Sequence, residues 1–391
     1  MSRDLSALDD YLYAAGVDGY LIDADSTDAD QYYLSGFDAP DPFLTLYDGS
    51  VRLLFARSLE YGRAVAESDG ETVERFVDYD YAAAVDEHGR EDADDVVIAR
   101  FLDSYGVDTV AVPPRFPLSR ADGLREQGID VRVDRDATVT GVRAVKTDDE
   151  LDARRAAQRA NEAAMAAAEE LLAGATVEGD RLYHDGEVLT SERVKEEIEV
   201  TLLREGCALD ETIVACGRDA ADPHDRGSGP LAPDEPIIVD IFPQNKASKY
   251  HADMTRTFCV GTPAETLAEW YDLTERAYRA ALAAVEPGVT GEAVHDAACD
   301  VYEDAGLPTL RADDGAETGF IHSTGHGVGL DVHELPSVAP GGAELQPGNV
   351  ISIEPGLYDP EVGGVRIEDL IAVTEDGYEN LTEYPVELVV D

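Results

Sequence analysis

Basic residues are scarce in this sequence of 391 residues. It has 30 Lys and Arg against 83 Asp and Glu, which gives a formal net charge of −53 at pH 7. Such a chain repels nucleic-acid phosphates and anionic membrane surfaces, so we expect no partner of either kind. Disorder is the alternative, but 44% of the residues are hydrophobic and they fall in periodic segments, which indicates a folded protein. We expect a soluble protein adapted to very salty water, as in halophilic archaea, because molar salt shortens the screening length to about 3 Å.

Cysteines and long apolar runs are also few. The four cysteines, Cys207, Cys216, Cys259 and Cys299, form no CxxC pair. Their spacing indicates free thiols in a reducing compartment rather than a disulfide framework or a zinc knuckle. No uncharged run is long enough to span a bilayer, and Met1–Leu5 does not begin an apolar signal segment. The sequence therefore predicts a cytoplasmic protein.

The first 145 residues have the pattern of an α/β domain. Helices are predicted at 5–15, 94–105 and 118–127, and strands at 19–23, 43–47, 51–56, 109–113 and 129–133. Asp48-Gly49-Ser50 is a strong hairpin signal between two of these strands. No cluster of catalytic residue types occurs here, so we expect this domain to cover a site, to aid dimer formation, or both.

A domain boundary is predicted near Val145 and Lys146. Directly after it, Thr147 and Glu150 have the spacing of a capping box, which predicts a helix from there to about residue 172. Further helices are predicted at 191–205, 264–285 and 291–305, with strands between the helix pairs. A hairpin is predicted at 181–188, with His184 facing solvent.

Four acidic residues stand in apolar, strand-like runs of this second part. They are Asp240 in 236–241, Asp253 in 251–258, Glu354 in 350–354 and Glu368 in 364–371. Acids are common in this chain, but an uncompensated buried carboxylate costs several kcal/mol. The nearby basic residues, Arg256 and Arg366, cannot balance four acids. Metal ions can.

The stretch His322–Glu334 places three histidines, His322, His326 and His333, among glycines that allow close backbone approach. Neutral imidazole is a common metal ligand and also a proton carrier near pH 7. Four carboxylates with one imidazole suit a pair of divalent cations such as manganese, cobalt, iron or zinc. Two metals about 3.5–4 Å apart can hold a hydroxide between them and polarise a carbonyl, which is hydrolase chemistry.

The order of these motifs resembles that of the pita-bread metallopeptidases, which include methionine aminopeptidases, aminopeptidase P and Xaa-Pro dipeptidases. The resemblance implies an α+β protein: a C-terminal pita-bread (creatinase/aminopeptidase) catalytic domain over 146–391, and an N-terminal α/β creatinase-like domain over 1–145. It also implies five metal ligands for two divalent ions, with manganese expected and cobalt, zinc or iron as alternatives. These ligands are Asp240, Asp253, His326, Glu354 and Glu368, of which Asp253 and Glu368 bridge the metals.

The same resemblance assigns catalytic roles. Glu354 is also the general base, His224 lies near the leaving nitrogen, and His333 hydrogen-bonds the substrate carbonyl. His322 matches a further active-site histidine of the Xaa-Pro branch, and Arg366 orients a ligand carboxylate.

Hydrolysis of N-terminal Xaa-Pro bonds by a metal-bridging hydroxide is the leading hypothesis, on proline-containing peptides. The N-terminal domain favours the branch of aminopeptidase P, prolidase and creatinase, for which a homodimer is expected; creatinase-like members lack the metal ligands. Two alternatives stay open: a dimetal hydrolase of the same fold acting on another amide or small molecule, and a non-enzymatic interaction protein on this scaffold.

The chain departs from the family pattern near the predicted site. Asp240-Ile-Phe242-Pro243 stands where the family usually has Asp-x-Gly, and the loop from Asp240 to Asp253 is two residues longer than usual. The hairpin at 181–188 looks inserted. These differences leave the pocket's specificity open, including the choice between dipeptides and longer peptides, but they remove no ligand.

Overall fold

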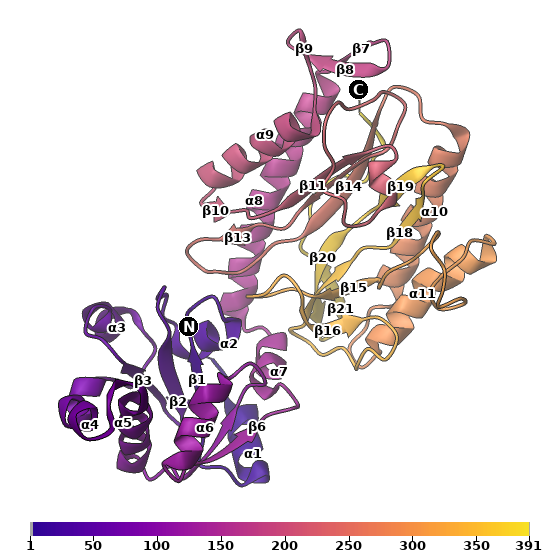
Figure 1. The fold of residues 1–391 in the computed structure, drawn as a ribbon. Helices are drawn as coiled ribbons and strands as arrows, with labels where there is room; N and C mark the ends of the chain where they lie inside the picture. Colours follow the sequence, from indigo (N-terminus) through magenta and orange to yellow (C-terminus); the bar gives the residue numbers. More distant parts are fainter. Residues whose placement is uncertain (1–2, 391) are drawn as a thin grey trace. The chain divides into compact units, whose positions relative to one another are not determined.

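The computed structural model describes residues 3–390, apart from the side chain of Glu91. The chain divides into two compact units, Met1–Arg143 and Ala144–Asp391 (Figure 1). The boundary lies next to the one predicted from the sequence, where the capping box begins.

The first unit is built on a six-stranded sheet with the order β4-β3-β2-β1-β5-β6. Its strands are β1 (Gly19–Ala24), β2 (Phe43–Tyr47), β3 (Val51–Phe55), β4 (Thr72–Arg75), β5 (Thr109–Val112) and β6 (Asp130–Val133). Its helices are α1 (Ser6–Ala15), α2 (Ala29–Ser35), α3 (Tyr61–Glu67), α4 (Tyr81–His88), α5 (Arg90–Ser104), α6 (Leu118–Glu126) and α7 (Thr138–Ala144), with a 3₁₀ turn at Phe76–Tyr79. The neighbours β1, β2 and β3 run antiparallel, and the other pairs are parallel.

Alternate residues of these strands serve two cores, as the period of a strand requires. Leu44 and Leu54 pack with α4, α5 and α6 on one face, whereas Phe43 and Phe55 pack with α3 on the other. The predicted hairpin joins β2 to β3, and Gly49 supplies the positive φ of +95° that the turn requires. Helices on both faces of the sheet make this unit the predicted α/β domain.

The described residues of the second unit form two larger sheets and four long α-helices. The helices are α8 (Asp148–Ala173), α9 (Ser191–Arg204), α10 (Glu265–Ala284) and α11 (Gly291–Asp304). One sheet has the order β11 (Thr212–Cys216), β12 (Ile237–Ile241), β14 (Met254–Val260), β22 (Val389–Val390). The other has the order β16 (Glu334–Val338), β15 (Gly325–Gly327), β17 (Val350–Ile353), β20 (Asp369–Thr374), β21 (Gly377–Asn380).

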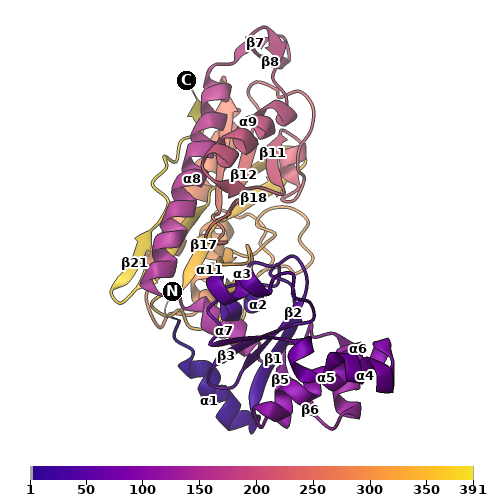
Figure 2. The ribbon, with the colours of Figure 1, turned by 90° about the vertical axis from the view of Figure 1, so that its left-hand side faces the viewer.

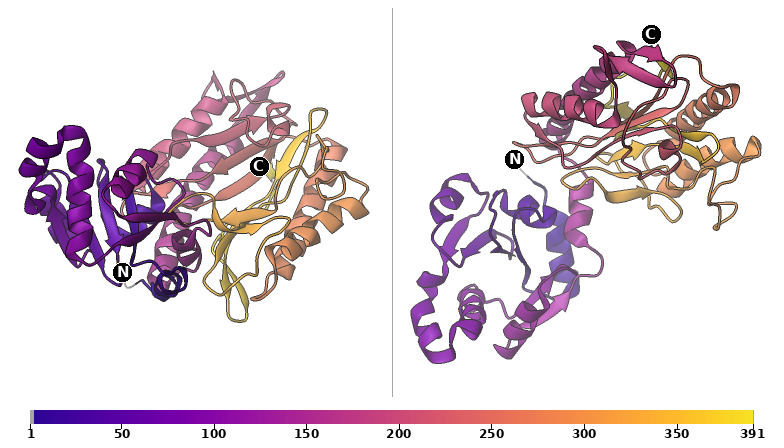
Figure 3. Two further views of the ribbon diagram at one scale, coloured as in Figure 1. Left: turned by 60° about the horizontal axis from the view of Figure 1, so that its bottom comes forward. Right: turned by 45° about the horizontal axis from the view of Figure 1, so that its top comes forward.

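Each helix pair covers a different sheet. Residues of α8 and α9 share a core with β11, β12 and β14, and Figure 2 shows the two helices side by side over these strands. Residues of α10 and α11 share another core with β17 and β20, and the orange helix pair lies beside the yellow strands in Figure 3. The sheets thus meet between the helix pairs.

Short strand groups complete the unit. They are β10 (Cys207–Ala208) with β13 (Gln244–Asn245), β18 (Gly356–Asp359) with β19 (Gly363–Arg366), and β7 (Thr176–Glu178) with β8 (Arg181–His184) and β9 (Glu187–Val188); a 3₁₀ turn spans Asp219–Ala221. The predicted hairpin turns at Asp185 and Gly186, both with positive φ. The prediction that His184 faces solvent is wrong, because its side chain is 23% exposed and lies near Gly174 at the end of α8.

The capping box is present at the start of α8. Thr147 Oγ1 accepts from the Glu150 amide at 3.4 Å, and the Glu150 carboxylate accepts from the Thr147 amide at 2.8 Å. Three acids are placed differently from the prediction: Asp253 precedes β14, Glu354 follows β17, and Glu368 lies between β19 and β20. Only Asp240 lies within a strand. The acids therefore cluster where strands end.

Candidate active site

The glycine-rich stretch packs closely against its neighbours. A Cβ at Gly325 would lie 1.9 Å from the Ser352 carbonyl oxygen, and one at Gly327 would lie 2.1 Å from the Leu335 carbonyl oxygen. Glycine is therefore required on both sides of His326, which β15 holds between β16 and β17. His326 Nδ1 lies 3.1 Å from the Gly327 carbonyl oxygen, to which it can only donate. This contact leaves Nε2 for a partner in the cavity.

Strand register brings the four acids together. Ile353 pairs with Asp369 in antiparallel β17 and β20, so Glu354 and Glu368 lie just beyond the same end of the ladder. Asp240 pairs with Thr255, and Asp253 precedes Thr255 by two residues. The Glu368 amide donates to the Thr255 carbonyl at 3.1 Å, which connects the two sheets at this point.

A cavity of about 700 Å³ lies at this junction. All nine predicted site residues line it: Asp240, Asp253, His326, Glu354, Glu368, His224, His322, His333 and Arg366. Ligand atoms of Asp253, His326 and Glu368 all lie within 4.8 Å of one another. His326 Nε2 is also 3.2 Å from Glu354 Oε1. The structure thus brings together every residue singled out for chemistry.

The clustered charges shift the pKa values of the acids. Burial, followed by the charge of Asp240, raises the pKa of Asp253 well above its usual range. Burial and the charge of Asp253 do the same for Glu368. Burial also raises the pKa of Asp240, against the opposing charge of Arg366. The ionised forms of these acids therefore need a cation.

Glu354 and His326 form a charge pair in the same cluster. Burial alone would raise the pKa of Glu354, but the hydrogen bond from His326 and its charge lower it to about 2. Burial alone would lower the pKa of His326, but its hydrogen bond to Glu354 and the charges of Glu354 and Asp253 raise it to about 9. Without a metal ion, a proton on His326 compensates part of the negative charge.

The residues present fit a pair of divalent metal ions. Asp240 Oδ1 and Glu368 Oε1 are buried and have no hydrogen-bond partner in the described part of the chain. Buried carboxylate oxygens are normally paired or bound to metal, because an unpaired one is costly. An oxygen-rich donor set with one imidazole is of the kind that manganese, cobalt, iron or zinc accept.

Arg366 fixes the acid that enters the cavity from β12. Its Nη2 donates to Asp240 Oδ2 at 2.5 Å, and its Nε donates to Thr255 Oγ1 at 3.1 Å. Thr255 Oγ1 in turn donates to Glu368 Oε2 at 2.7 Å. One oxygen of Asp240 and one of Glu368 are held in this way, and the other oxygen of each has no hydrogen-bond partner in residues 3–390.

Tyr358 is a site residue that sequence reasoning missed. Its hydroxyl accepts from Arg366 Nη1 at 2.9 Å and lies 3.1 Å from His322 Nε2. His322 Nδ1 lies 2.7 Å from the Ser323 carbonyl oxygen, so it donates there and its Nε2 accepts from Tyr358. Burial lowers the pKa of His322 to about 4, which keeps the ring neutral. Tyr358 stands in an ordinary apolar strand, so no local sequence signal indicates this role.

The two other histidines are more exposed. The His224 amide donates to Asp222 Oδ1 at 3.0 Å, which fixes the backbone of this loop. The ring centres of His333 and His326 are 4.0 Å apart, and the ring planes are inclined at 69°. Burial and the charge of His326 lower the pKa of His333. Both side chains border the cavity without belonging to the group of buried acids.

Arg256, the other cation considered above, is committed elsewhere. Its side chain is fully buried and its Nη2 lies 2.8 Å from Asp369 Oδ1. It also donates to the Glu368 carbonyl at 2.7 Å. Arg256 therefore supports the backbone of Glu368 and does not neutralise its carboxylate.

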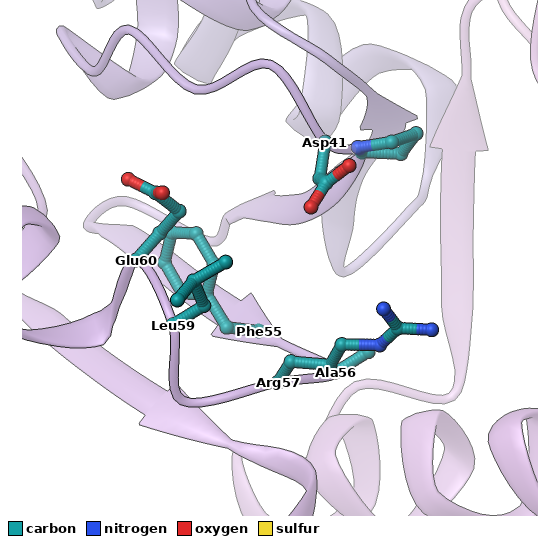
Figure 4. Close-up of a pocket in the computed structure, with 7 residues that line it drawn as sticks. Asp41, Phe55, Ala56, Arg57, Leu59 and Glu60 are labelled. Atoms are coloured by element: carbon teal, nitrogen blue, oxygen red, sulfur yellow. The ribbon is translucent and has the colours of Figure 1, made fainter.

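The first unit has a smaller hollow of about 250 Å³ (Figure 4). Asp41, Phe55, Arg57, Leu59 and Glu60 are among its lining residues, and Leu59 is 78% exposed. It gathers no group of acids and histidines like that of the second unit.

No helix among residues 3–390 is both long enough and apolar enough to cross a membrane.

Comparison with protein families matches both parts of the chain. The model described as metallopeptidase family M24 matches residues 152–375, which is more than half of the chain. The chain belongs to metallopeptidase family M24. A second model, the creatinase/prolidase N-terminal domain, matches residues 5–145 of this M24 member. The predicted α+β pita-bread fold with a creatinase-like N-terminal domain is confirmed, and membership of the family implies divalent metal ions.

Relatives of this M24 member include named peptidases. It is 38% identical over 250 residues to a probable dipeptidase PepE of Mycobacterium bovis, a match that covers 64% of this chain and only 61% of that protein. It is 28% identical to an Xaa-Pro dipeptidase of Pyrococcus furiosus, over 92% of both chains. The solved structure of the prolidase from Pyrococcus horikoshii OT3 is similar with a TM-score of 0.78, at 26% identity, over 98% of this chain and 99% of that one.

Proposed function

We propose that the protein is a metal-dependent peptidase that hydrolyses the N-terminal Xaa-Pro bond of proline-containing peptides. The observation that carries this proposal is the convergence of three buried acids, the half-buried Glu354 and one imidazole on a single cavity, with two carboxylate oxygens left without a hydrogen-bond partner in residues 3–390. The names of the relatives, Xaa-Pro dipeptidase and prolidase, support the choice of substrate.

Five residues would hold two divalent ions in this proposal: Asp240, Asp253, His326, Glu354 and Glu368. When bound, the ions supply Lewis-acid polarisation of the scissile carbonyl and a water that is acidic enough to be deprotonated near neutral pH. Manganese is the metal we propose, with cobalt, zinc or iron as alternatives. The cations would also remove the cost of keeping these carboxylates ionised in a buried cluster.

Glu354 is the proposed general base. Against the effect of burial, the hydrogen bond from His326 lowers its pKa to about 2 in the metal-free protein, and in the loaded site the bound cations would keep the carboxylate ionised. Oε1 already accepts from Ser352 Oγ at 3.0 Å, so Oε2 is the oxygen that would take the proton of the attacking water. Since the same carboxylate is a proposed ligand, it would hold the water and accept its proton in one place.

His333 and His224 act on the two sides of the scissile bond. The Xaa-Pro bond is a tertiary amide, and its nitrogen has to be protonated to leave as the secondary amine of proline. His224 would stand beside that nitrogen, and His333 would donate to the developing oxyanion. The neutral His322 and Tyr358 would shape the wall next to Arg366, which keeps Asp240 in place.

The proposal is tested with the full chain in molar KCl, supplied with Mn²⁺ or Co²⁺. An Xaa-Pro dipeptide and a longer peptide beginning with Xaa-Pro are compared with an Xaa-Ala dipeptide as the control. We expect cleavage of at least one of the two proline substrates, loss of cleavage after dialysis against a chelator, and recovery when Mn²⁺ is returned. Cleavage of no proline bond while metal is bound would reject the proposal.

A dimetal hydrolase of another amide is the second candidate, and one observation favours it. Phe242, which stands where the family usually has glycine, lines the cavity and changes its wall. A panel of amides would separate it from the first candidate, and the metal content of the purified protein would separate both from a non-enzymatic interaction protein.

A homodimer and a cytoplasmic location stay predictions.

A further inference from the structure

Arg226 is a cation on the cavity wall that the mechanism above does not use. It and Arg366 are the two arginines that line the cavity, where no lysine occurs among the lining residues. Arg366 is buried and committed to Asp240, Tyr358 and Thr255. Arg226 is 43% exposed, and its hydrogen-bond partner within residues 3–390 is Glu211, an exposed residue. Its guanidinium therefore has donors left for a ligand.

The backbone places Arg226 at a defined distance from the metal ligands. Its carbonyl accepts from the Val214 amide of β11 at 3.1 Å, and the preceding residue of β11, Ile213, pairs with Asp240 of β12. A Cβ at Gly227 would lie 1.9 Å from the Val214 carbonyl oxygen, so this segment is pressed against β11. Two strand spacings of about 4.8 Å thus separate the backbone of Arg226 from that of Asp240.

Phe242 holds the guanidinium over the cavity. The Arg226 guanidinium carbon lies 5.8 Å from the centre of the Phe242 ring, within the range of a cation–π contact. Phe242, Ile213, Ile321 and Val332 also give this wall apolar surface. An apolar wall next to a cation suits a ligand that has a small apolar ring and a carboxylate, as proline does.

Charge complementarity points the same way. Two divalent cations would balance the charge of the four acids, so the loaded cavity would no longer repel a negative group. The arginine available to bind one is Arg226, because Arg366 is held by Asp240. In an Xaa-Pro dipeptide the terminal carboxylate lies one residue beyond the scissile carbonyl, which is about 3.5 Å of extended chain. The long side chain of Arg226, whose backbone is two strand spacings from that of Asp240, can reach a carboxylate at this position.

We propose that Arg226 binds the C-terminal carboxylate of the substrate, so that the protein is a dipeptidase rather than an aminopeptidase for longer chains. This inference rests on the proposed Xaa-Pro activity. In a longer peptide a neutral amide stands where the carboxylate of a dipeptide would be, and Arg226 makes no charged hydrogen bond to it. Planar guanidinium is well suited to carboxylate, which it can bind through two parallel hydrogen bonds.

The test compares an Xaa-Pro dipeptide with the same dipeptide carrying a C-terminal amide, in wild type and in Arg226→Met. We expect wild type to favour the free acid about tenfold in kcat/KM, the worth of one partly exposed charged contact. Arg226→Met should raise KM for the acid about tenfold, keep kcat within about threefold, and leave the amide unchanged. Arg218→Met, which removes an exposed arginine outside the cavity, is the matched control.

Two further measurements keep the outcomes separate. Glu211→Gln frees Arg226 from its exposed partner and should lower KM for the acid but not for the amide. Calorimetric titration of the metal-loaded protein with proline and with prolinamide measures binding without turnover. Proline should bind more tightly than prolinamide to wild type, but not to Arg226→Met. Equal cleavage of acid and amide, or equal binding of proline by wild type and Arg226→Met, would overturn the role of Arg226 and leave the Xaa-Pro activity standing. Absence of any proline-bond cleavage together with a preference for proline in the titration would reject the activity instead.

Discussion

Glu368 and Asp369 are adjacent acids with opposite expected effects on stability. Asp369 Oδ1 pairs with the buried Arg256 at 2.8 Å, and its Oδ2 accepts from Tyr278 and, at 2.6 Å, from Asn380. Glu368 has one oxygen bonded to Thr255 and one buried oxygen without a partner. We therefore predict that Asp369→Asn destabilises the metal-free protein, whereas Glu368→Gln does not.

The expected change in unfolding free energy depends on which buried charge loses its partner in each variant. Asp369→Asn leaves the Arg256 guanidinium buried without its counter-charge, a change that costs about 3–5 kcal/mol in other proteins. That is a large part of a typical unfolding free energy of about 5–15 kcal/mol. Glu368→Gln removes a carboxylate whose pKa is raised by burial and by the charge of Asp253. The amide can still accept from Thr255, so stability without metal should stay equal or increase.

Urea unfolding in molar KCl with a chelator measures both effects. Trp270 is the single tryptophan and packs against the core under α10 and α11, so its fluorescence reports on the second unit. We expect a much lower midpoint for Asp369→Asn and an unchanged or higher midpoint for Glu368→Gln. Equal midpoints for Asp369→Asn and wild type, or a similar loss in both variants, would refute this reasoning.

Three shorter predictions follow from the same site. Gly325→Ala should lower the urea midpoint and weaken manganese binding, because its Cβ would meet the Ser352 carbonyl oxygen at 1.9 Å, whereas Gly315→Ala, with 3.5 Å to its nearest atom, should change neither. His333→Gln should lower kcat by about 10²- to 10³-fold with unchanged manganese content, and a loss of metal would contradict its role as an oxyanion donor. The urea midpoint of wild type should rise with KCl; full stability in dilute buffer would count against adaptation to salt.

Much of the fold follows from local signals. The capping box of Thr147 and Glu150 and the turn at Asp48-Gly49-Ser50 act through neighbours in sequence, so they mark α8 and the β2–β3 hairpin without tertiary information. His184 is different, because its packing near Gly174 depends on how a hairpin folds back onto the end of a helix. No pattern within the hairpin itself contains that information.

The candidate site was predictable in its residue types and only partly in its geometry. An acid in an apolar run stands out, but Glu368 and Asp369 are neighbouring acids that the sequence pattern does not distinguish. Asp369 pairs with Ile353 in the sheet and Glu368 lies just outside it, and this difference depends on long-range strand pairing. Long-range pairing likewise decides that Arg256 meets Asp369. The hydroxyl of Tyr358 gains its position from Arg366 across the β18–β19 hairpin, which sequence reasoning did not resolve.

Metal stoichiometry tests the central claim most directly, since the whole account depends on two divalent ions held by five side chains. The full chain is dialysed against a chelator, reloaded with Mn²⁺ in molar KCl, freed of excess metal and examined by elemental analysis. We predict about two manganese ions per chain in wild type and a clear loss in Glu368→Gln, with Glu361→Gln as the exposed control outside the cavity. Wild type that retains no manganese, or Glu368→Gln that retains as much as wild type, would contradict the account.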